Sequence, residues 1–277
     1  MAEAPSVVVP TLDRKALLRE CLLSLLEQDS PPGEILVVDN GSVDGTAGML
    51  DREFPLVRRV LEPRRGVHHA RNRGVREARG RIVCFIDDDC VAPKGWLRAL
   101  AACFDDASVA AAGGPTRPVW EAPPPRGLLH SRNGLSYLGI VDFGPERRLV
   151  GSGREFLIGA NLALRKDVAE REGLFRAVFP LPGTGVCAED FDLFRRLSRR
   201  HPVVYEPAAY VHHRILPHKL RWSYLATRVF CIEAANSRLR APLDARRRFP
   251  ELLFWEGGMS LAKLLGRGFG WLLPALR

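Results

Sequence analysis

The sequence lacks the short motifs that mark several common nucleotide and hydrolase sites. No GxGxxG follows the first apolar run and no GxxxxGK[ST] occurs in the 277 residues, which argues against an ordinary dinucleotide-binding fold and a P-loop. HExxH and GxSxG are absent as well, so neither a zincin protease nor an α/β-hydrolase is indicated. A phosphorylated ligand would therefore have to be held by a metal ion and side chains instead of a glycine-rich loop.

Aromatic residues and paired cysteines are also scarce. Aromatic residues make up 8% of the chain and do not interleave with basic residues, so a nucleic-acid-binding platform is not indicated. The six cysteines include no CxxC pair and resemble small buried side chains in a reducing compartment. The first residues show neither the basic segment nor the long apolar run of a signal peptide, so we expect a cytoplasmic protein.

The charge balance favours an anionic partner. Lysine and arginine number 41 against 32 acidic residues, which gives a formal charge of +9. This excess suits a phosphorylated small molecule, a nucleic acid or an acidic membrane surface, and composition does not choose among them. A hydrophobic content of 46% over this length is ample for one large core.

The first ninety residues alternate between strand-like and helix-like patterns. Short apolar runs in "SVVVP", "EILVVDNGS", "VRRVLEP" and "RIVCFI" predict four strands. Helical spacing between them predicts a helix after Asp13, which we expect to be its N-cap, a short helix from about Asp44, and a helix over "VHHARNRGVREARG". Strands without a polar face, alternating with helices, are typical of an α/β layer with a mostly parallel sheet.

The rest of the sequence is less regular. Residues 115–153 are rich in Pro, Gly and Arg and predict an irregular loop or a lid-bearing connection. A strand and short helix are expected in "EFLIGANLALRKDVAEREG", and an amphipathic helix after the glycine-rich "GTGVC". "PVVYEPAAYVHHRI" indicates either two strands or one strand with a break.

Carboxylates follow two of the predicted strands. Asp39 ends one strand, and Asp87, Asp88 and Asp89 directly follow another. The carboxyl ends of parallel strands share one edge of a sheet, where ligands bind in such folds. Carboxylate oxygens suit Mg²⁺ or Mn²⁺, which commonly bridge a protein to phosphates. The sequence therefore predicts a metal ion at this edge with a nucleotide diphosphate behind it.

Two further groups are candidates for chemistry. Glu189 and Asp190 lie at the start of a predicted helix, where acids are common for electrostatic reasons alone; the functional interpretation is a general base. His212 and His213 lie near the end of a strand, and because alternate strand residues face opposite ways, one of them at most can face the metal.

Taken together, the chain resembles the family 2 glycosyltransferases of the nucleotide-sugar-binding A fold. The resemblance spans roughly residues 6–213, in that family's order, through "VVVPTLDR", "EILVVDNGSVDGT", "GVHHARNRGVREARGRIVCFIDDDC", "FLIGANLALRK", "AEDFDLFRRL" and "YVHH". It implies a GT-A-type Rossmann-like α/β sandwich, with a mostly parallel central sheet, flanking helices and a helical C-terminal extension. Within this we expect a nucleotide-sugar-binding half (1–115), an acceptor and catalytic half (116–216) and the extension (217–277).

The resemblance also implies an activity and residue roles. A sugar would pass from a nucleotide diphosphate donor to an acceptor hydroxyl with inversion, assisted by Mg²⁺ or Mn²⁺. The implied donor-binding residues are Thr11, Asp39, Arg71, Asp87, Asp88 and Asn161. The implied metal ligands are Asp89 and one histidine, with His213 favoured over His212. Asp190 matches the catalytic base and Glu189 its neighbour.

Rival functions and the acceptor stay open at this point. A sugar nucleotidyltransferase would normally carry a Gly-rich and basic loop after the first strand, and a non-catalytic nucleotide-sugar-binding protein would be expected to lose the acids or the base.

The acceptor is either a lipid-linked sugar or a small-molecule natural product. The apolar tail "ELLFWEGGMSLAKLLGRGFGWLLPALR" either packs on the domain or, with the basic "RLRAPLDARRR", contacts the inner face of the membrane peripherally.

Overall fold

The computed structural model describes residues 4–125, 128–129, 132–151, 155–178 and 188–240. The chain divides into two compact units. Among the described residues, the first unit comprises 4–119, 139–151, 155–176 and 189–214, and the second comprises 120–125, 128–129, 132–138, 177–178, 188 and 215–240. This division follows spatial contacts, and the three-part division expected from the sequence stays a prediction.

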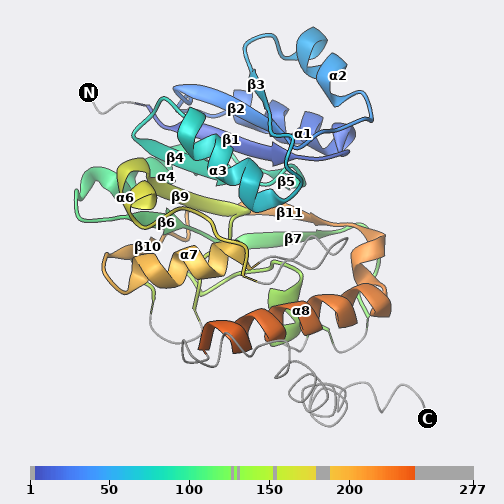
Figure 1. Cartoon of the computed structure of the whole chain (residues 1–277), viewed down its shortest axis with the longest axis vertical. Helices are drawn as coiled ribbons and strands as arrows, with labels where there is room; N and C mark the ends of the chain where they lie inside the picture. The colour runs from blue at the N-terminus through green and yellow to red at the C-terminus, as the bar shows by residue number, and fades with distance from the viewer. Residues whose placement is uncertain (1–3, 126–127, 130–131, 152–154, 179–187, 241–277) are drawn as a thin grey trace. The chain divides into compact units, whose positions relative to one another are not determined.

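An eight-stranded sheet forms the centre of the first unit (Figure 1). Its strand order is β3-β2-β1-β4-β9-β6-β10-β8. β1, β2, β3 and β4 run parallel, and β9 is antiparallel to both of its neighbours. The strands are β1 (Ser6–Thr11), β2 (Glu34–Asp39), β3 (Arg58–Leu61), β4 (Ile82–Ile86), β6 (Ala111–Gly113), β8 (Arg148–Leu149), β9 (Asn161–Arg165) and β10 (Val203–Tyr205).

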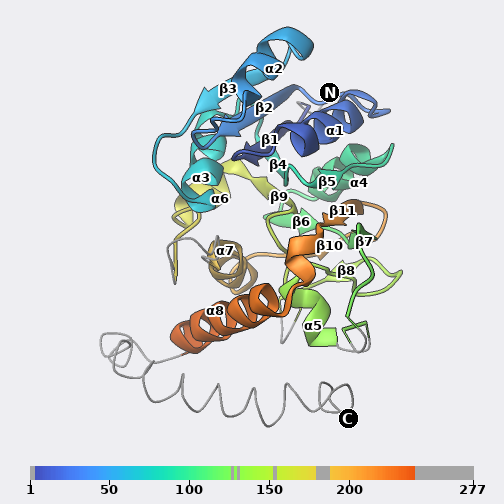
Figure 2. The same cartoon turned by 90° about the vertical axis from the view of Figure 1, so that its right-hand side faces the viewer.

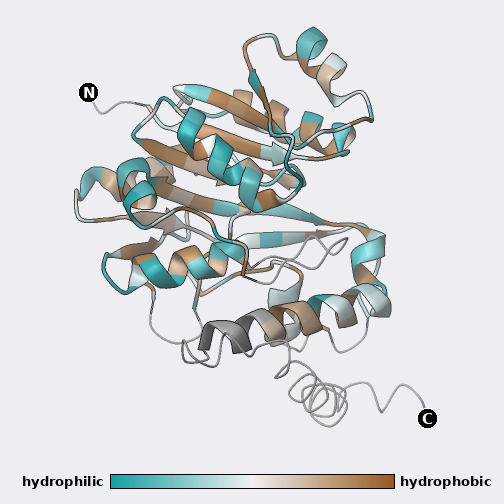
Figure 3. Ribbon diagram, in the orientation of Figure 1, coloured by the Kyte–Doolittle hydropathy of each residue, from teal (hydrophilic) through white to brown (hydrophobic). Residues whose placement is uncertain are grey.

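Helices cover both faces of this sheet, which explains why its strands are apolar throughout. In β1, Val7 and Val9 pack into one hydrophobic cluster and Val8 packs into the other. Figure 2 shows α1 and α4 on one side and α3, α6 and α7 on the other, and Figure 3 shows the apolar strands between amphipathic helices. The helices are α1 (Lys15–Leu26), α2 (Thr46–Glu53), α3 (Val67–Glu77), α4 (Trp96–Ala102), α6 (Lys166–Arg171) and α7 (Glu189–Ser198).

The mostly parallel α/β fold expected from the sequence is confirmed. The predicted burial of the cysteines is confirmed for the five in the described part of the chain, and Cys187 lies outside it. One close approach needs glycine: a Cβ at Gly74 of α3 would lie 2.4 Å from Cγ1 of Val8. Helix α3 therefore packs directly against β1.

A second sheet has the order β5-β11-β7. It comprises β5 (Cys90–Val91), β7 (Thr116–Trp120) and β11 (Val211–Ile215). The segment "PVVYEPAAYVHHRI" therefore forms two strands, and they belong to different sheets because β10 joins the large one. β5 directly follows the three aspartates after β4, so this small sheet connects them to the histidines of β11.

The expectation for the start of α1 is wrong. Asp13 is not the N-cap of α1, since the cap position is Arg14 and Asp13 has a left-handed φ of 52°. Its carboxylate accepts a hydrogen bond from the N–H of Val43, while Asp44 accepts one from the N–H of Lys15 at 2.8 Å. The helix start is thus satisfied by a residue distant in sequence, which no local pattern could reveal.

The expected irregular stretch at 115–153 contains regular elements. β7 and β8 lie in it, as does α5 (Arg132–Tyr137). β7 is paired with β11, about a hundred residues further on, so its strand structure depends on a distant partner and not on local periodicity.

The second unit contains α5, a short 3-10 helix at Pro217–Leu220, and α8 (Trp222–Arg240). Nε of Arg228 on α8 donates to the carbonyl of Tyr137 at the end of α5, at 3.2 Å. Across the described ranges no helix is both long and apolar enough to cross a bilayer. The apolar tail lies outside the described residues.

Candidate active site

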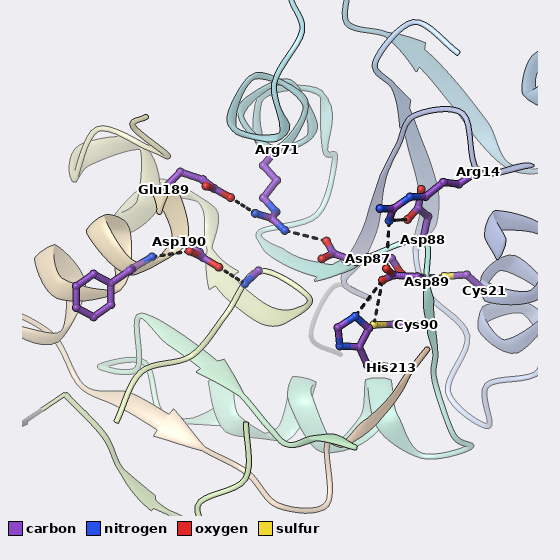
Figure 4. A network of polar contacts seen from close by, with 12 residues as sticks. Arg14, Cys21, Arg71, Asp87, Asp88, Asp89, Cys90, Glu189, Asp190 and His213 are labelled. Carbon is purple, nitrogen blue, oxygen red and sulfur yellow. Dashed lines mark hydrogen bonds and ion pairs between the residues drawn. The ribbon is translucent and has the colours of Figure 1, made fainter. Parts of the chain in front are cut away.

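Three aspartates follow β4 and point to three different partners (Figure 4). Asp87 faces Arg71 of α3, with 2.8 Å between Oδ1 and Nη2. Asp88 accepts a 2.8 Å hydrogen bond from the hydroxyl of Thr11 at the end of β1. Asp89 lies 3.5 Å from Nε2 of His213. The turn after β4 thus gives each aspartate at least one partner that the other two do not have.

Arg14 holds two of these carboxylates together. Its Nη1 lies 3.0 Å from Oδ1 of Asp88 and 3.1 Å from Oδ2 of Asp89, and both aspartates are buried. Burial raises the pKa of Asp88 to about 6, although the charge of Arg14 opposes this effect and that of Asp89 adds to it. For Arg14, burial opposes the charged form, but the two carboxylates outweigh it and raise its pKa.

Asp89, Cys90 and His213 form a compact group of metal-ligand atoms. One carboxylate oxygen, the thiol sulfur and one imidazole nitrogen all lie within 4.8 Å of one another. Cys90 and His213 are directly opposite in the antiparallel β5–β11 pair, so their side chains share a face of the small sheet. The carboxylate oxygen suits an ion such as Mn²⁺, and imidazole nitrogen and thiol sulfur suit one such as Zn²⁺, so the residues present fit a divalent metal ion.

The two histidines differ as the strand geometry requires. His213 is 5% exposed and faces Asp89, whereas His212 is opposite Val91 and its ring lies edge-on to Tyr210. The structure therefore brings His213, and not His212, to the aspartates.

Arg71 connects the aspartates to α7. Its guanidinium contacts Asp87 on one side and Glu189 on the other, and the whole side chain is buried. Burial, together with the nearby charge of Asp190, raises the pKa of Glu189 to about 7, and Arg71 opposes this shift. Because Arg71 lies between two acids, it fixes the distance between the end of β4 and the start of α7.

Asp190 is half-buried in the first turn of α7. Its Oδ2 accepts a hydrogen bond from the N–H of Gly159 at 3.1 Å, and its Oδ1 accepts one from the N–H of Phe191. Gly159 also lies against Arg71, since a Cβ there would be 2.3 Å from the Arg71 Cζ. A glycine at this position therefore lets the backbone lie between the arginine and the acid.

Five carboxylates thus gather around two guanidinium groups at the carboxyl ends of β1 and β4. The five are Asp87, Asp88, Asp89, Glu189 and Asp190, and the two arginines are Arg14 and Arg71. A model of the family described as "Glycosyl transferase family 2" matches residues 6–173, more than half of the chain. The chain belongs to glycosyl transferase family 2.

The similarity of this family 2 chain to individual relatives extends over different fractions of its length. The uncharacterized glycosyltransferase YfnE of Bacillus subtilis is 41% identical over 93 residues, 32% of this chain and 24% of that protein. The glucosyl-dolichyl phosphate glucuronosyltransferase of Haloferax volcanii is 26% identical over 238 residues, 81% of this chain and 74% of that protein. The chain spans 24%, 55% and 64% of the length of three of the curated relatives it matches.

A solved structure shows the same fold. The mannosyltransferase PcManGT from Pyrobaculum calidifontis, in complex with GDP-Man and Mn²⁺, has a TM-score of 0.62 at 22% identity. The similarity covers 98% of this chain and 76% of that one. At this identity the likeness shows the fold alone.

Two expected donor-binding residues of the family 2 chain form hydrogen bonds to groups outside the acidic cluster. Asp39 is buried at the end of β2, and its Oδ1 accepts from the N–H groups of Gly41 and Ser42. The Asn161 amide accepts from the Trp96 indole, and it donates to the carbonyls of Pro115 and Ala209. Both side chains organise the backbone around the site, and their contact with a donor stays a prediction.

Three residues around the site were not singled out from the sequence. Arg14 could have been suspected as a basic residue just beyond the first strand. Cys90 directly follows the aspartates in "DDDC", but its position opposite His213 depends on strand pairing across about 120 residues. Gly159 had no signal beyond its place in "IGAN".

Proposed function

We propose that this chain is a glycosyltransferase that moves a sugar from a nucleotide diphosphate donor to an acceptor hydroxyl with inversion of configuration. The observation that carries the proposal is the acidic cluster at the strand ends, where Asp89 and His213 lie within reach of one divalent ion. Family membership supports the reaction class, and it disfavours the sugar nucleotidyltransferase and the non-catalytic binding protein.

The donor would be held by residues on three strand ends and α3. The structural neighbour is in complex with GDP-Man and Mn²⁺, which supports a metal-bound nucleotide diphosphate donor for this chain. Asp89 and His213 would hold Mn²⁺ or Mg²⁺, and the ion, when bound, stabilises negative charge on the departing diphosphate. Thr11, Asp39 and Asp87 would contact the nucleoside, and Arg71 is the nearby cation for the diphosphate.

Asp190 would act as the general base. It lies in the first turn of α7, and the hydrogen bond from Gly159 fixes the direction of the carboxylate. In the reaction the acceptor oxygen forms a bond to the anomeric carbon, and the bond from that carbon to the diphosphate oxygen breaks. The acceptor's proton passes to Asp190, and the electron pair leaves with the nucleoside diphosphate. A single displacement of this kind inverts the anomeric centre.

For the acceptor we propose a lipid-linked sugar as the first class to test. The relative from Haloferax volcanii is named for a glucosyl-dolichyl phosphate, and another relative is named for a pyrophosphoryl-undecaprenol glycan. The basic run at residues 238–248 and the apolar tail after it would suit peripheral contact with a membrane. A small-molecule natural product is the alternative acceptor.

The proposal is tested by thermal denaturation with UDP, GDP, dTDP and CDP, each with and without Mn²⁺. A ligand at about 100 times its dissociation constant adds roughly 2.7 kcal/mol of stability, so one nucleotide should raise the melting temperature in the presence of the metal. The active nucleotide identifies the donor's base. If none of the four shifts the melting temperature with or without metal, the strand-end cluster is not a nucleotide site.

A further inference from the structure

Cys90 is the one member of the metal-ligand group to which the proposed function gives no role. It is 1% exposed, and its sulfur lies 3.9 Å from Oδ1 of Asp89. The same oxygen lies 3.5 Å from Nε2 of His213. Figure 4 shows the thiol and the imidazole converging on this carboxylate oxygen. The oxygen is therefore shared by one sulfur and one nitrogen donor.

The two separations from this oxygen are close to those expected between ligands of one small ion. With metal–sulfur bonds of about 2.3 Å and metal–nitrogen or metal–oxygen bonds of about 2.1 Å, ligand atoms in a tetrahedral site lie about 3.4 to 3.6 Å apart. The observed 3.5 Å and 3.9 Å to the shared Asp89 oxygen are within a few tenths of an ångström of this geometry, and the third separation, between the Cys90 sulfur and the imidazole, is at most 4.8 Å. Cross-strand pairing of Cys90 with His213 holds the two side chains on one face.

The other described cysteines near the large sheet have different surroundings. Burial raises the pKa of the Cys21, Cys84 and Cys103 thiols, as expected for inert structural cysteines. Cys21 and Cys103 contact backbone carbonyls. Among the residues that the structure describes, Cys90 alone joins an aspartate and a histidine in a three-residue ligand group.

We propose that Cys90 is a third protein ligand of the divalent ion held by Asp89 and His213, and that its thiolate raises the affinity of the site for Co²⁺ and Zn²⁺ much more than for Mn²⁺ and Mg²⁺. On binding, the S–H bond breaks, its proton passes to solvent and a sulfur–metal bond forms. Thiolates favour softer ions, while Mg²⁺ prefers oxygen ligands. This inference deepens the proposed function and rests on its metal site.

The test is a titration of the full chain with Co²⁺, followed by absorption spectroscopy and by calorimetry. A cobalt–thiolate bond gives an intense near-ultraviolet charge-transfer band that oxygen and nitrogen ligands do not give. We expect this band in the wild type and its loss in Cys90→Ser and Cys90→Ala. Removing the ligand should weaken Co²⁺ and Zn²⁺ binding by at least about 10-fold, with little change for Mg²⁺. Cys103→Ala and Cys187→Ala are the controls and should keep the band.

Each outcome bears on the inference by itself. A wild-type complex with saturating Co²⁺ and no charge-transfer band overturns it, and so does a band that persists in both Cys90 variants or disappears in a control. If one Cys90 variant fails to fold, the other supplies the comparison, and a wild-type spectrum without the band overturns the inference by itself. If the band depends on Cys90 but no nucleotide binds, the ligand assignment holds and the proposed transferase function fails. If the band is missing and nucleotides bind equally well with Mn²⁺ in wild type and Cys90→Ser, the ligand assignment of Cys90 fails and the proposed transferase function is retained.

Discussion

At the scale of single residues, Asp190 has the most specific expected role. The variant Asp190→Asn keeps the size and, with its one oxygen, the hydrogen bond from Gly159, but it gives up the hydrogen bond from Phe191 and the ability to accept a proton. We expect nucleotide binding to be unchanged and transfer to fall by about 10²- to 10⁴-fold, the usual contribution of a general base. Release of nucleoside diphosphate from the sugar donor measures transfer, and thermal denaturation measures binding.

Asp192→Asn is the matched control for this variant. Asp192 lies in the same first turn of α7, but its carboxylate pairs with Arg196 on the same helix at 2.8 Å. Transfer should change little, because the Asp192 carboxylate is engaged with Arg196 and not with Gly159 or Arg71. Turnover within tenfold of wild type in Asp190→Asn would remove Asp190 from the role of base.

At the scale of secondary structure elements, the contact between α3 and β1 sets the position of Arg71. Gly74→Ala places a methyl group 2.4 Å from Cγ1 of Val8, which is fully buried. We expect a loss of about 1–3 kcal/mol in the free energy of unfolding, the usual cost of overpacking a core. Urea denaturation followed by circular dichroism measures it.

Gly48→Ala provides the comparison, since Gly48 is also a helical glycine. In α2 the added Cβ would meet only the end of the flexible Arg52 side chain, at 3.1 Å. Without a core clash, alanine should stabilise the helix by roughly 0.5–1 kcal/mol relative to glycine. Equal effects of the two substitutions would contradict the close packing of α3 on β1.

Glu34 joins the start of β2 to neighbouring elements and makes stability depend on pH. It accepts hydrogen bonds from the hydroxyl of Ser6, the N–H of Arg79 and the guanidinium of Arg58. Burial raises the pKa of Glu34, but these hydrogen bonds outweigh burial and lower it below the ordinary value of 4.5.

A lowered pKa in the folded state means that the unfolded chain binds the proton more readily. The stabilising contribution of Glu34 is therefore complete well above pH 4.5 and is lost as the pH falls through its folded-state pKa. We expect the difference in unfolding free energy between wild type and Glu34→Gln to be larger at pH 7 than near pH 3. Urea denaturation across this range measures the difference, and a difference that grows as the pH falls would refute the assignment.

A helix or strand could be predicted when its own residues carry the pattern that forms it, and it was missed when it depends on residues far away in the sequence. β1, β2 and β4 were predictable because both of their faces are buried, so their sequences are continuous apolar runs. The first turn of α1 was not, because Asp44 lies 29 residues from the N–H it satisfies. β7 was missed for the same reason, since its pairing partner β11 follows much later in the chain.

At the scale of the whole molecule, part of the candidate site is visible in local sequence patterns and part depends on the pairing of distant segments. Asp87, Asp88 and Asp89 stand out in the sequence because three adjacent acids after a buried strand are unusual, and the parallel sheet predicts the edge they occupy. The inclusion of Cys90 and the choice of His213 over His212 follow from the register between β5 and β11. That register depends on the pairing of distant segments, which one sequence does not specify.

The whole chain's charge and its C-terminal residues lead to the last prediction. The net charge is +9, and residues 238–248 carry five arginines against one aspartate. Each basic residue near an anionic membrane contributes about 1 kcal/mol of attraction, which salt screens. We expect the full chain to sediment with phosphatidylglycerol vesicles at low salt, to be released at high salt, and to bind phosphatidylcholine vesicles poorly.

Deletion of residues 250–277 separates the two roles left open for the apolar tail. If the tail anchors the chain at a membrane interface, the shortened protein stays folded, keeps its nucleotide-dependent melting shift and loses most of its vesicle binding, because charge attraction without buried apolar area gives weak binding. If the tail packs on the domain, deletion lowers the melting temperature or causes aggregation. Folding measured by circular dichroism, together with vesicle sedimentation, distinguishes these results, and vesicle binding that survives deletion would place the membrane contact elsewhere in the chain.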